Sequence, residues 1–209
     1  NRRLRYQLMQ YINLQQFVRD ISSMFYRKHN VLKLKSYGVK LGRKNKIINK
    51  CYFTIEKGAN VKIGDDFLFI SGSGFNPISR NLRGSFYACQ GSNIRIGNHV
   101  GMSSPSIWIK MGLIIGNNVV IGANCIIIDS NMHSTNYKER RNYESDVSNA
   151  VSKSIIIGND IFIGMNCMIL KGVHIGDRSI IAAGSVVIND VPKDVIAGGN
   201  PCRVIKRIN

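Results

Sequence analysis

The sequence predicts a mainly β chain that winds into a coil with sides six residues long. A large aliphatic residue returns at every sixth position from Ile157 to Val187 without a slip. A glycine often follows it, as in Ile157-Gly-Asn-Asp and Ile163-Gly-Met-Asn, and the same period holds from Ile109 to Ile127. A period of six fits no single helix. It fits a coil that turns a corner every six residues, so that equivalent positions stack and bury a continuous aliphatic column.

The residue types within each six-residue unit support this interpretation. The aliphatic residue at the first position points inward, and the small residue after it relieves the backbone at the corner. The fifth position must be small or medium to share the same interior, and it holds Val119, Cys125, Ile161, Cys167, Val173, Ser179 and Ser185. Cys125 and Cys167 are therefore predicted to be packing residues, because buried thiols away from cations are inert.

Composition and charge limit the function. The 209 residues suffice for one domain with a core, and Lys plus Arg exceed Asp plus Glu by 29 to 12, a formal charge of +17. Such an excess indicates an anionic partner: a nucleic acid, an acidic glycan, a phosphorylated cofactor or a membrane surface. A basic surface that only maintains solubility is the alternative. Nucleic acid is supported by charge alone, without a binding motif, so we expect no nucleic-acid partner.

The five cysteines are widely spaced and lack a CxxC pair, which argues against a disulfide framework or a zinc site and favours a reducing cytoplasm. No apolar run reaches the length of a membrane span, and no secretory leader is visible. We expect a cytoplasmic protein that requires no metal.

Residues 1–35 predict a basic amphipathic helix, because apolar residues recur at spacings of three and four. They are Leu4, Leu8, Tyr11, Ile12, Val18, Ile21 and Phe25, with Gln15 on the same face. The helix either caps one end of the coil or lies on an anionic membrane, with residues 1–30 giving a peripheral contact at the inner membrane face.

Residues 36–95 predict irregular coils. Ile63-Gly-Asp-Asp and Ile96-Gly-Asn-His carry the corner pattern, but the stretch from Ser71 to Gln90 fits no repeat and is interpreted as an excursion. Residues 96–195 form the regular repeat domain, which the polar loop 133–153 interrupts, and residues 196–209 form a tail. Long loops inserted into a compact repeat are uncommon and often functional, so this loop is the predicted site.

A set of motifs in the second half is specific in order and register. Ile157-Gly-Asn-Asp-Ile-Phe-Ile-Gly is followed by Leu170-Lys-Gly-Val-His-Ile-Gly, Ala183-Gly-Ser-Val-Val and Gly199-Asn-Pro-Cys-Arg-Val-Ile-Lys. Over residues 95–209 the chain resembles the hexapeptide-repeat acyltransferases with a left-handed parallel β-helix. Within them it is similar to the maltose, galactoside and nodulation-factor O-acetyltransferases and to polysaccharide O-acetyltransferases. The resemblance implies a left-handed triangular prism, an exception to the usual crossover hand, and a homotrimer with active sites between subunits.

The resemblance also implies His133 as the catalytic base, in the stretch Asp129-Ser-Asn-Met-His133-Ser-Thr. Imidazole titrates near neutral pH, as a group that takes a proton from a hydroxyl and returns it to a thiolate must do. His29, His99 and His174 are interpreted as structural. A metal enzyme of the carbonic anhydrase type would need three converging histidines, and the local pairing for that is missing.

Acetyl-CoA is the acyl donor that the resemblance implies. The backbone amide at the corner Gly164-Met165 would stabilise the oxyanion, although the family often has serine where Met165 stands. The pantetheine would lie near Ala183, and Arg203 and Lys206 would bind the phosphates. A lysine usual in the family just after Val187 is replaced here by Ile188-Asn189.

The acceptor site is expected on turns that face His133, with Ser103 and Trp108 as binding residues. Trp108 would stack on a sugar face, with a core or interface position as the alternative. Asp129 would orient His133 or bind a hydroxyl. The sequence predicts an acetyl-CoA-dependent O-acetyltransferase acting on a sugar hydroxyl in capsular or lipopolysaccharide glycan biosynthesis. The alternatives are an N-acetyltransferase of an amino sugar and a non-catalytic β-helix structural protein.

Overall fold

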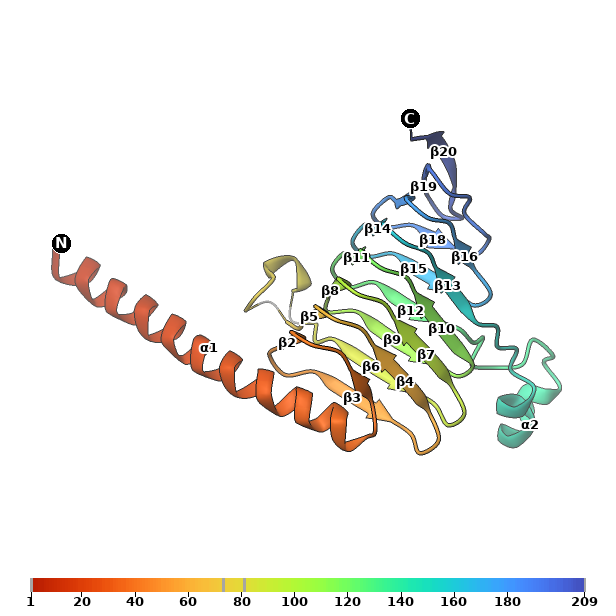
Figure 1. Ribbon diagram of the computed structural model, residues 1–209, viewed down its shortest axis with the longest axis horizontal. Helices are drawn as coiled ribbons and strands as arrows, with labels where there is room; N and C mark the ends of the chain where they lie inside the picture. Colours follow the sequence, from red (N-terminus) through yellow and green to blue (C-terminus); the bar gives the residue numbers. More distant parts are fainter. Residues whose placement is uncertain (1, 73, 81, 209) are drawn as a thin grey trace.

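The chain folds into one long helix followed by a coil of short strands (Figure 1). The computed structural model describes residues 2–72, 74–80 and 82–208, without the side chains of residues 2–13, 15 and 18. The predicted apolar residues Leu4, Leu8, Tyr11, Ile12 and Val18, and Gln15 on the same face, therefore lie outside the described side chains. In the described chain, no helix is both long and apolar enough to cross a membrane.

The strands form three sheets, named here A, B and C, and β1 to β18 follow one another through the three in turn. Sheet A consists of β1 (Lys40–Leu41), β4 (Asn60–Ile63), β7 (Asn93–Ile96), β10 (Gly112–Ile115), β13 (Ile155–Ile157) and β16 (His174–Ile175). Sheet B consists of β2 (Lys46–Ile48), β5 (Leu68–Ile70), β8 (Gly101–Ser103), β11 (Val120–Ile121), β14 (Phe162–Ile163), β17 (Ile180–Ile181), β19 (Val195–Gly198) and β20 (Arg203–Arg207). Sheet C consists of β3 (Tyr52–Ile55), β6 (Ser85–Ala88), β9 (Ser106–Ile109), β12 (Ile126–Ile128), β15 (Met168–Leu170) and β18 (Val186–Val187).

Parallel pairing in strict register builds the core. Ile96, Ile115, Ile157 and Ile175 are register partners on successive strands of sheet A, and none is more than 2% exposed. Because side chains alternate across a strand, every second residue enters the interior and its neighbours face outward. The predicted mainly β coil with an N-terminal helix and an extruded loop is confirmed.

Glycines at the corners allow successive turns to stack closely. A Cβ on Gly97 would lie 2.4 Å from the carbonyl oxygen of Gly116, and one on Gly116 would lie 2.5 Å from that of Gly158. The fifth-position thiols are also interior, since Cys125 and Cys167 are fully buried and lie 3.1 and 3.2 Å from the carbonyl oxygens of Gly164 and Ala182.

Residues 36–95 differ from the irregular coils that the sequence predicts, because β1 to β7 join the same three sheets. Aromatic rings replace isoleucine in these turns. Phe53 and Phe69 are at most 4% exposed, with ring centroids 5.5 Å apart. The rings occupy the same inward positions as the aliphatic residues of later turns, so the six-residue aliphatic period is not visible in this part of the sequence. The excursion lies between Ser71 and Gly84 and contains the short 3-10 helix η1 (Pro77–Ser79).

The N-terminal helix α1 (Arg2–Ser36) touches the coil through its last turns and otherwise projects from it (Figure 1). The Asn30 side-chain amide donates to the carbonyl oxygens of Ile47 at 3.2 Å and Asn49 at 2.8 Å, and Leu34 is 1% exposed. Farther out, Arg19 donates to the carbonyl oxygen of Gly74 in the excursion at 3.1 Å.

Candidate active site at the loop after sheet C

The loop leaves the coil at the end of β12, and its two ends are tied together. Ser130 and Ser152 form an isolated antiparallel bridge. The backbone nitrogen of Asn131 donates to Val151 at 3.0 Å, and that of Lys153 donates to Asp129 at 2.9 Å. Met132 then takes a left-handed backbone conformation, with φ of 65°, just before His133. The root of the loop is therefore fixed to the coil by backbone contacts.

The loop contains two short helices, η2 (Glu139–Arg141) and α2 (Tyr143–Ser148). Asn142 caps α2, because its side-chain oxygen accepts from the backbone nitrogen of Ser145 at 3.0 Å. The Arg140 guanidinium donates to the carbonyl oxygen of Ser134 at 2.7 Å, which closes the loop on itself. Asp146 lies in α2 and is 6% exposed.

His133 and Asp146 form a close pair. Nδ1 of His133 lies 2.6 Å from Oδ2 of Asp146, and the backbone nitrogen of Ser134 donates to Oδ1 at 2.8 Å. The His133 side chain is 68% exposed and that of Asp146 only 9%. The carboxylate is thus shielded behind an accessible ring.

The ionised Asp146 carboxylate favours one tautomer of the neutral His133 imidazole. The hydrogen bond from His133 holds the pKa of the Asp146 carboxyl below its usual value, with a smaller contribution from the Ser134 backbone N–H. An ionised Asp146 accepts hydrogen bonds only, so a neutral His133 carries its proton on Nδ1. Nε2 is then the basic atom, as general-base chemistry on a hydroxyl requires.

Asp129 does not have the role that the sequence predicts, which was to orient His133 or to bind a hydroxyl. Its side chain is fully buried, and its carboxylate accepts from the backbone nitrogens of Lys110, Met111 and Gly112 at 2.7, 2.7 and 2.8 Å. With both oxygens occupied by the neighbouring turn, Asp129 does not orient His133 or meet a sugar hydroxyl. The sequence interpretation of Asp129 is corrected: it fixes the corner between β9 and β10.

Lys110, on the corner that Asp129 fixes, reaches the loop. Its Nζ donates to the carbonyl oxygen of Val147, beside Asp146 in α2, at 2.9 Å. A cation near the C-terminal end of a helix also interacts favourably with the free carbonyls there. This hydrogen bond joins a side chain of the coil to the backbone of α2, the helix that holds Asp146.

Ser103 and Trp108 lie on different sheets. Trp108 is on the outer face of sheet C, 40% exposed, and stacks on Tyr87 with ring centroids 4.5 Å apart and an interplanar angle of 14°. A hollow of about 270 Å³ lies along this face, lined by both rings. Ser103 ends β8 in sheet B. The structure therefore places Trp108, but not Ser103, on the sheet from which the loop emerges.

The residues expected to bind the acyl donor follow the C-terminal turns. Gly164 and Ala183 stack on successive corners, since a Cβ on Gly164 would lie 2.5 Å from the Ala183 nitrogen. Met165 is partly buried at the same corner. Arg203 and Lys206 are exposed on β20, which pairs antiparallel with β19, so the region expected to be a tail forms a hairpin strand.

Comparisons with known proteins agree with this architecture. The family described as bacterial transferase hexapeptide (six repeats) matches residues 154–189, and the hexapeptide repeat of succinyl-transferase matches residues 112–130. The resemblance to the hexapeptide-repeat acyltransferases is confirmed.

A curated relative is the galactoside O-acetyltransferase of Escherichia coli (strain K12), 40% identical over 124 residues, or 59% of this chain and 58% of the relative. The chain thus spans less than two thirds of that relative's length. Among solved structures, a galactoside acetyltransferase in complex with coenzyme A superposes with a TM-score of 0.58 at 27% identity, covering 87% of this chain and 70% of that one. A hexapeptide-repeat acetyltransferase from Vibrio cholerae, complexed with acetyl coenzyme A, gives 0.57 at 27% identity, with 87% and 77% covered.

Asp146 is the residue that the sequence analysis missed. It lies 13 positions after His133, in a stretch without periodicity. Asn142 followed by Glu144 and Asp146 is a helix-start pattern, which could have predicted α2. Among the described residues, no group of three or more His, Cys, Asp or Glu side chains is arranged to hold a metal ion.

Proposed function

We propose that the protein is an acetyl-CoA-dependent O-acetyltransferase that acts on a sugar hydroxyl, with His133 as the general base and Asp146 as its positioning residue. The observation that supports this most is the 2.6 Å contact between Nδ1 of His133 and the shielded Asp146 carboxylate. It would leave Nε2 as the basic atom of an exposed ring, at the point where the six-residue period stops after Ile127. The relatives named acetyltransferases support the reaction class.

In the proposed reaction, Nε2 of His133 removes the proton of the acceptor hydroxyl as its oxygen attacks the thioester carbonyl. The tetrahedral intermediate collapses, the carbon–sulfur bond breaks, and the imidazolium returns the proton to the leaving thiolate. The products are the O-acetyl ester and free coenzyme A. Asp146 stabilises the imidazolium while it exists and keeps the ring in the required tautomer.

The donor is proposed to lie along the C-terminal turns. The backbone N–H at Met165 would face the developing oxyanion, and the exposed corner at Ala183 would contact the pantetheine. Arg203 and Lys206 on β20 are exposed cations suited to phosphate. The coenzyme A complexes of the structural relatives support donor binding by this fold.

The test measures thiol release from acetyl-CoA with a panel of neutral sugars, amino sugars and acidic sugars. His133→Asn should lower turnover by roughly 10²-fold or more, because the base is lost. His99→Asn is a matched control, since His99 is also exposed and faces an aspartate, Asp66, at 3.5 Å. Unchanged turnover in His133→Asn would remove the base assignment, and acetylation of amines alone would favour the N-acetyltransferase.

A homotrimer belongs to the same proposal. Large apolar side chains face outward on sheets B and C, among them Trp108, Val120, Phe162 and Met168, each at least 40% exposed. Burial of such faces between subunits would remove them from water. Light scattering on the purified protein should give a trimer mass, and Phe162→Glu should lower it. A monomeric unmodified protein would contradict this part.

The helix α1 is proposed to bring the protein to an anionic membrane, where lipid-linked precursors of capsular or lipopolysaccharide glycans are found. Exposed apolar side chains form a stripe on α1: Leu14, Phe17, Ile21, Met24, Phe25 and Leu32, each at least 49% exposed. On a helical projection they lie opposite Asn30 and Leu34, which face the coil. Removal of residues 1–28 should release the protein from phosphatidylserine vesicles in a sedimentation assay. Retained binding, or aggregation of the truncated protein, would favour the capping role.

A further inference from the structure

The outer face of sheet A carries three cations in direct register. Lys40 pairs with Lys62, and Lys62 pairs with Arg95, on the neighbouring strands β1, β4 and β7. All three side chains are exposed. Neighbouring strands lie about 4.8 Å apart, so the backbone positions that carry the three positive charges follow one another at about that spacing. We name Lys40, Lys62 and Arg95 the cation ladder.

Nothing in the described chain neutralises the cation ladder. The ion pairs of the described residues involve other side chains, and the outward positions of β1, β4, β7 and β10 include no carboxylate. Like charges directly opposite one another on adjacent strands destabilise a sheet. An arrangement that costs stability and lacks an internal partner indicates an anionic partner from outside.

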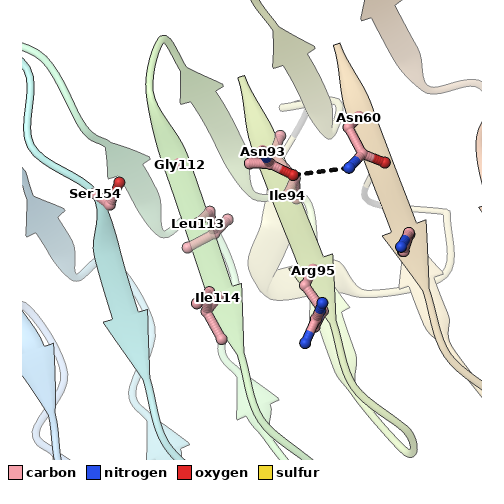
Figure 2. Close-up of a pocket in the computed structure, with 9 residues that line it drawn as sticks. Asn60, Asn93, Ile94, Arg95, Gly112, Leu113, Ile114 and Ser154 are labelled. Atoms are coloured by element: carbon pink, nitrogen blue, oxygen red, sulfur yellow. Dashed lines mark hydrogen bonds between the residues drawn. The ribbon is translucent and has the colours of Figure 1, made fainter. Parts of the chain in front are cut away.

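The cation ladder lines a groove with hydrogen-bonding groups at one end. Lys62 and Arg95 belong to two adjoining hollows of about 370 and 410 Å³. In the first hollow the Asn60 side-chain amide donates to Asn93 at 2.8 Å (Figure 2). Beside Asn93 the strand position is Gly112, where a Cβ would lie 2.6 Å from Oγ of Ser154. The missing side chain therefore gives room to the Ser154 hydroxyl, and Asn60, Asn93 and Ser154 line this end of the first hollow together.

This end of the groove adjoins the loop that carries His133. Ser154 directly follows Lys153, whose backbone nitrogen bonds to Asp129 at the root of the loop, and Gly112 donates to the Asp129 carboxylate at 2.8 Å. A ligand in the groove would therefore extend from the cation ladder toward the corner from which the loop emerges.

We infer that this groove binds an acidic glycan, an extended sugar chain with carboxylates or phosphates, as the acceptor of the proposed transfer. Regularly spaced anions along a sugar chain match the cation ladder, and sugar hydroxyls match the amides of Asn60 and Asn93. Aromatic side chains, on which nucleic-acid bases stack, are missing from the outward positions of β1, β4, β7 and β10 in the described chain. The inference rests on the proposed function, because it assigns the substrate class of the same reaction.

The experiment measures binding of polygalacturonate oligomers, which carry one carboxylate per sugar, by calorimetry, with dextran as the neutral comparison. The variant Lys62→Ala/Arg95→Ala should weaken polygalacturonate binding by about tenfold or more, because two charge-assisted contacts are lost. The matched control is Lys46→Ala/Lys50→Ala, which removes two exposed lysines from the region of sheet B and should stay within about twofold. Removing the repulsion within the cation ladder should leave the melting temperature unchanged or raise it.

Several outcomes would overturn the inference. They are no binding of polygalacturonate by the unmodified protein, equal losses in the two double variants, or tighter binding of single-stranded oligothymidylate or phosphatidylserine vesicles through the same two residues. Thiol release with a small neutral sugar separates this inference from the proposed function. If that reaction persists while polygalacturonate fails to bind, only the acidic-glycan assignment is lost. If His133→Asn leaves thiol release unchanged while the cation ladder still binds, only the base assignment is lost.

Discussion

The C-terminal turns of the coil and the loop 133–153 are stabilised in different ways. In the turns, the first-position residues Ile157, Ile163, Ile169, Ile175, Ile181 and Val187 are all fully buried. In the loop, polar contacts dominate: Asp146 accepts from His133 and Ser134, and Lys110 donates to Val147. Apolar packing is non-directional, so it stabilises the turns but orients no reactive group. Hydrogen bonds are directional, and they fix the orientation of the His133 ring. The regular region therefore supplies the scaffold, and the irregular one supplies the proposed chemistry.

The largest expected effect is on the stability of the coil, and it differs between the buried and the exposed face of β13. Ile157→Ala should lower the free energy of unfolding by about 3 kcal/mol, because it leaves a cavity in a fully packed column. Its neighbour Ile156, 40% exposed on the same strand, provides the control, and Ile156→Ala should cost below about 1 kcal/mol. Chemical denaturation of both variants checks this. Equal losses would show that the two faces of β13 are not distinct in the assembled protein.

The next effect is expected in the loop. Asp146→Asn should reduce turnover by roughly 10²-fold with only a small, measurable fall in melting temperature, because the amide no longer selects the Nδ1-protonated ring or stabilises the imidazolium. The pH profile of the remaining activity should shift, which a merely structural role would not produce. Asp66→Asn, beside His99, is the matched control. A large fall in melting temperature with an unchanged pH profile would reduce Asp146 to a structural residue.

The sequence predicted the parts of the fold that depend on local repetition. The six-residue period predicts which side chains are buried, as for Ile157 to Val187. The same period stops after Ile127, and this break drew attention to His133. The early turns were harder to predict, because Phe53 and Phe69 fill inward positions with rings in place of isoleucine. Asp146 was not predictable as the partner of His133, since its position depends on the path of the loop. That path includes a contact distant in sequence, from Lys110 to Val147.

A smaller effect should come from that distant contact. Lys110→Met keeps most of the side-chain length but removes the donor to Val147, so α2 should sample other positions and turnover should fall about fivefold. The Lys110 backbone bond to Asp129 remains, so the corner should keep its stability. Kinetics and hydrogen exchange of residues 143–148 measure the two consequences. Unchanged exchange together with unchanged turnover would show that α2 is placed without Lys110.

The smallest effect is the pH dependence of the contact between His133 and Asp146 within the loop. The pKa of Asp146 is lowered in the folded protein by its hydrogen bond with His133, so the ionised carboxylate stabilises the folded state. This contribution is complete above the pKa of an unfolded aspartate, about 3.9, and disappears as the pH falls through the lower folded value. The difference in melting temperature between the unmodified protein and Asp146→Asn should therefore be present at about pH 5 and shrink below about pH 4. A difference that persists at lower pH would mean that the Asp146 side chain stabilises the protein by packing rather than by charge. The loop would then be stabilised at Asp146 in the same way as the packed coil.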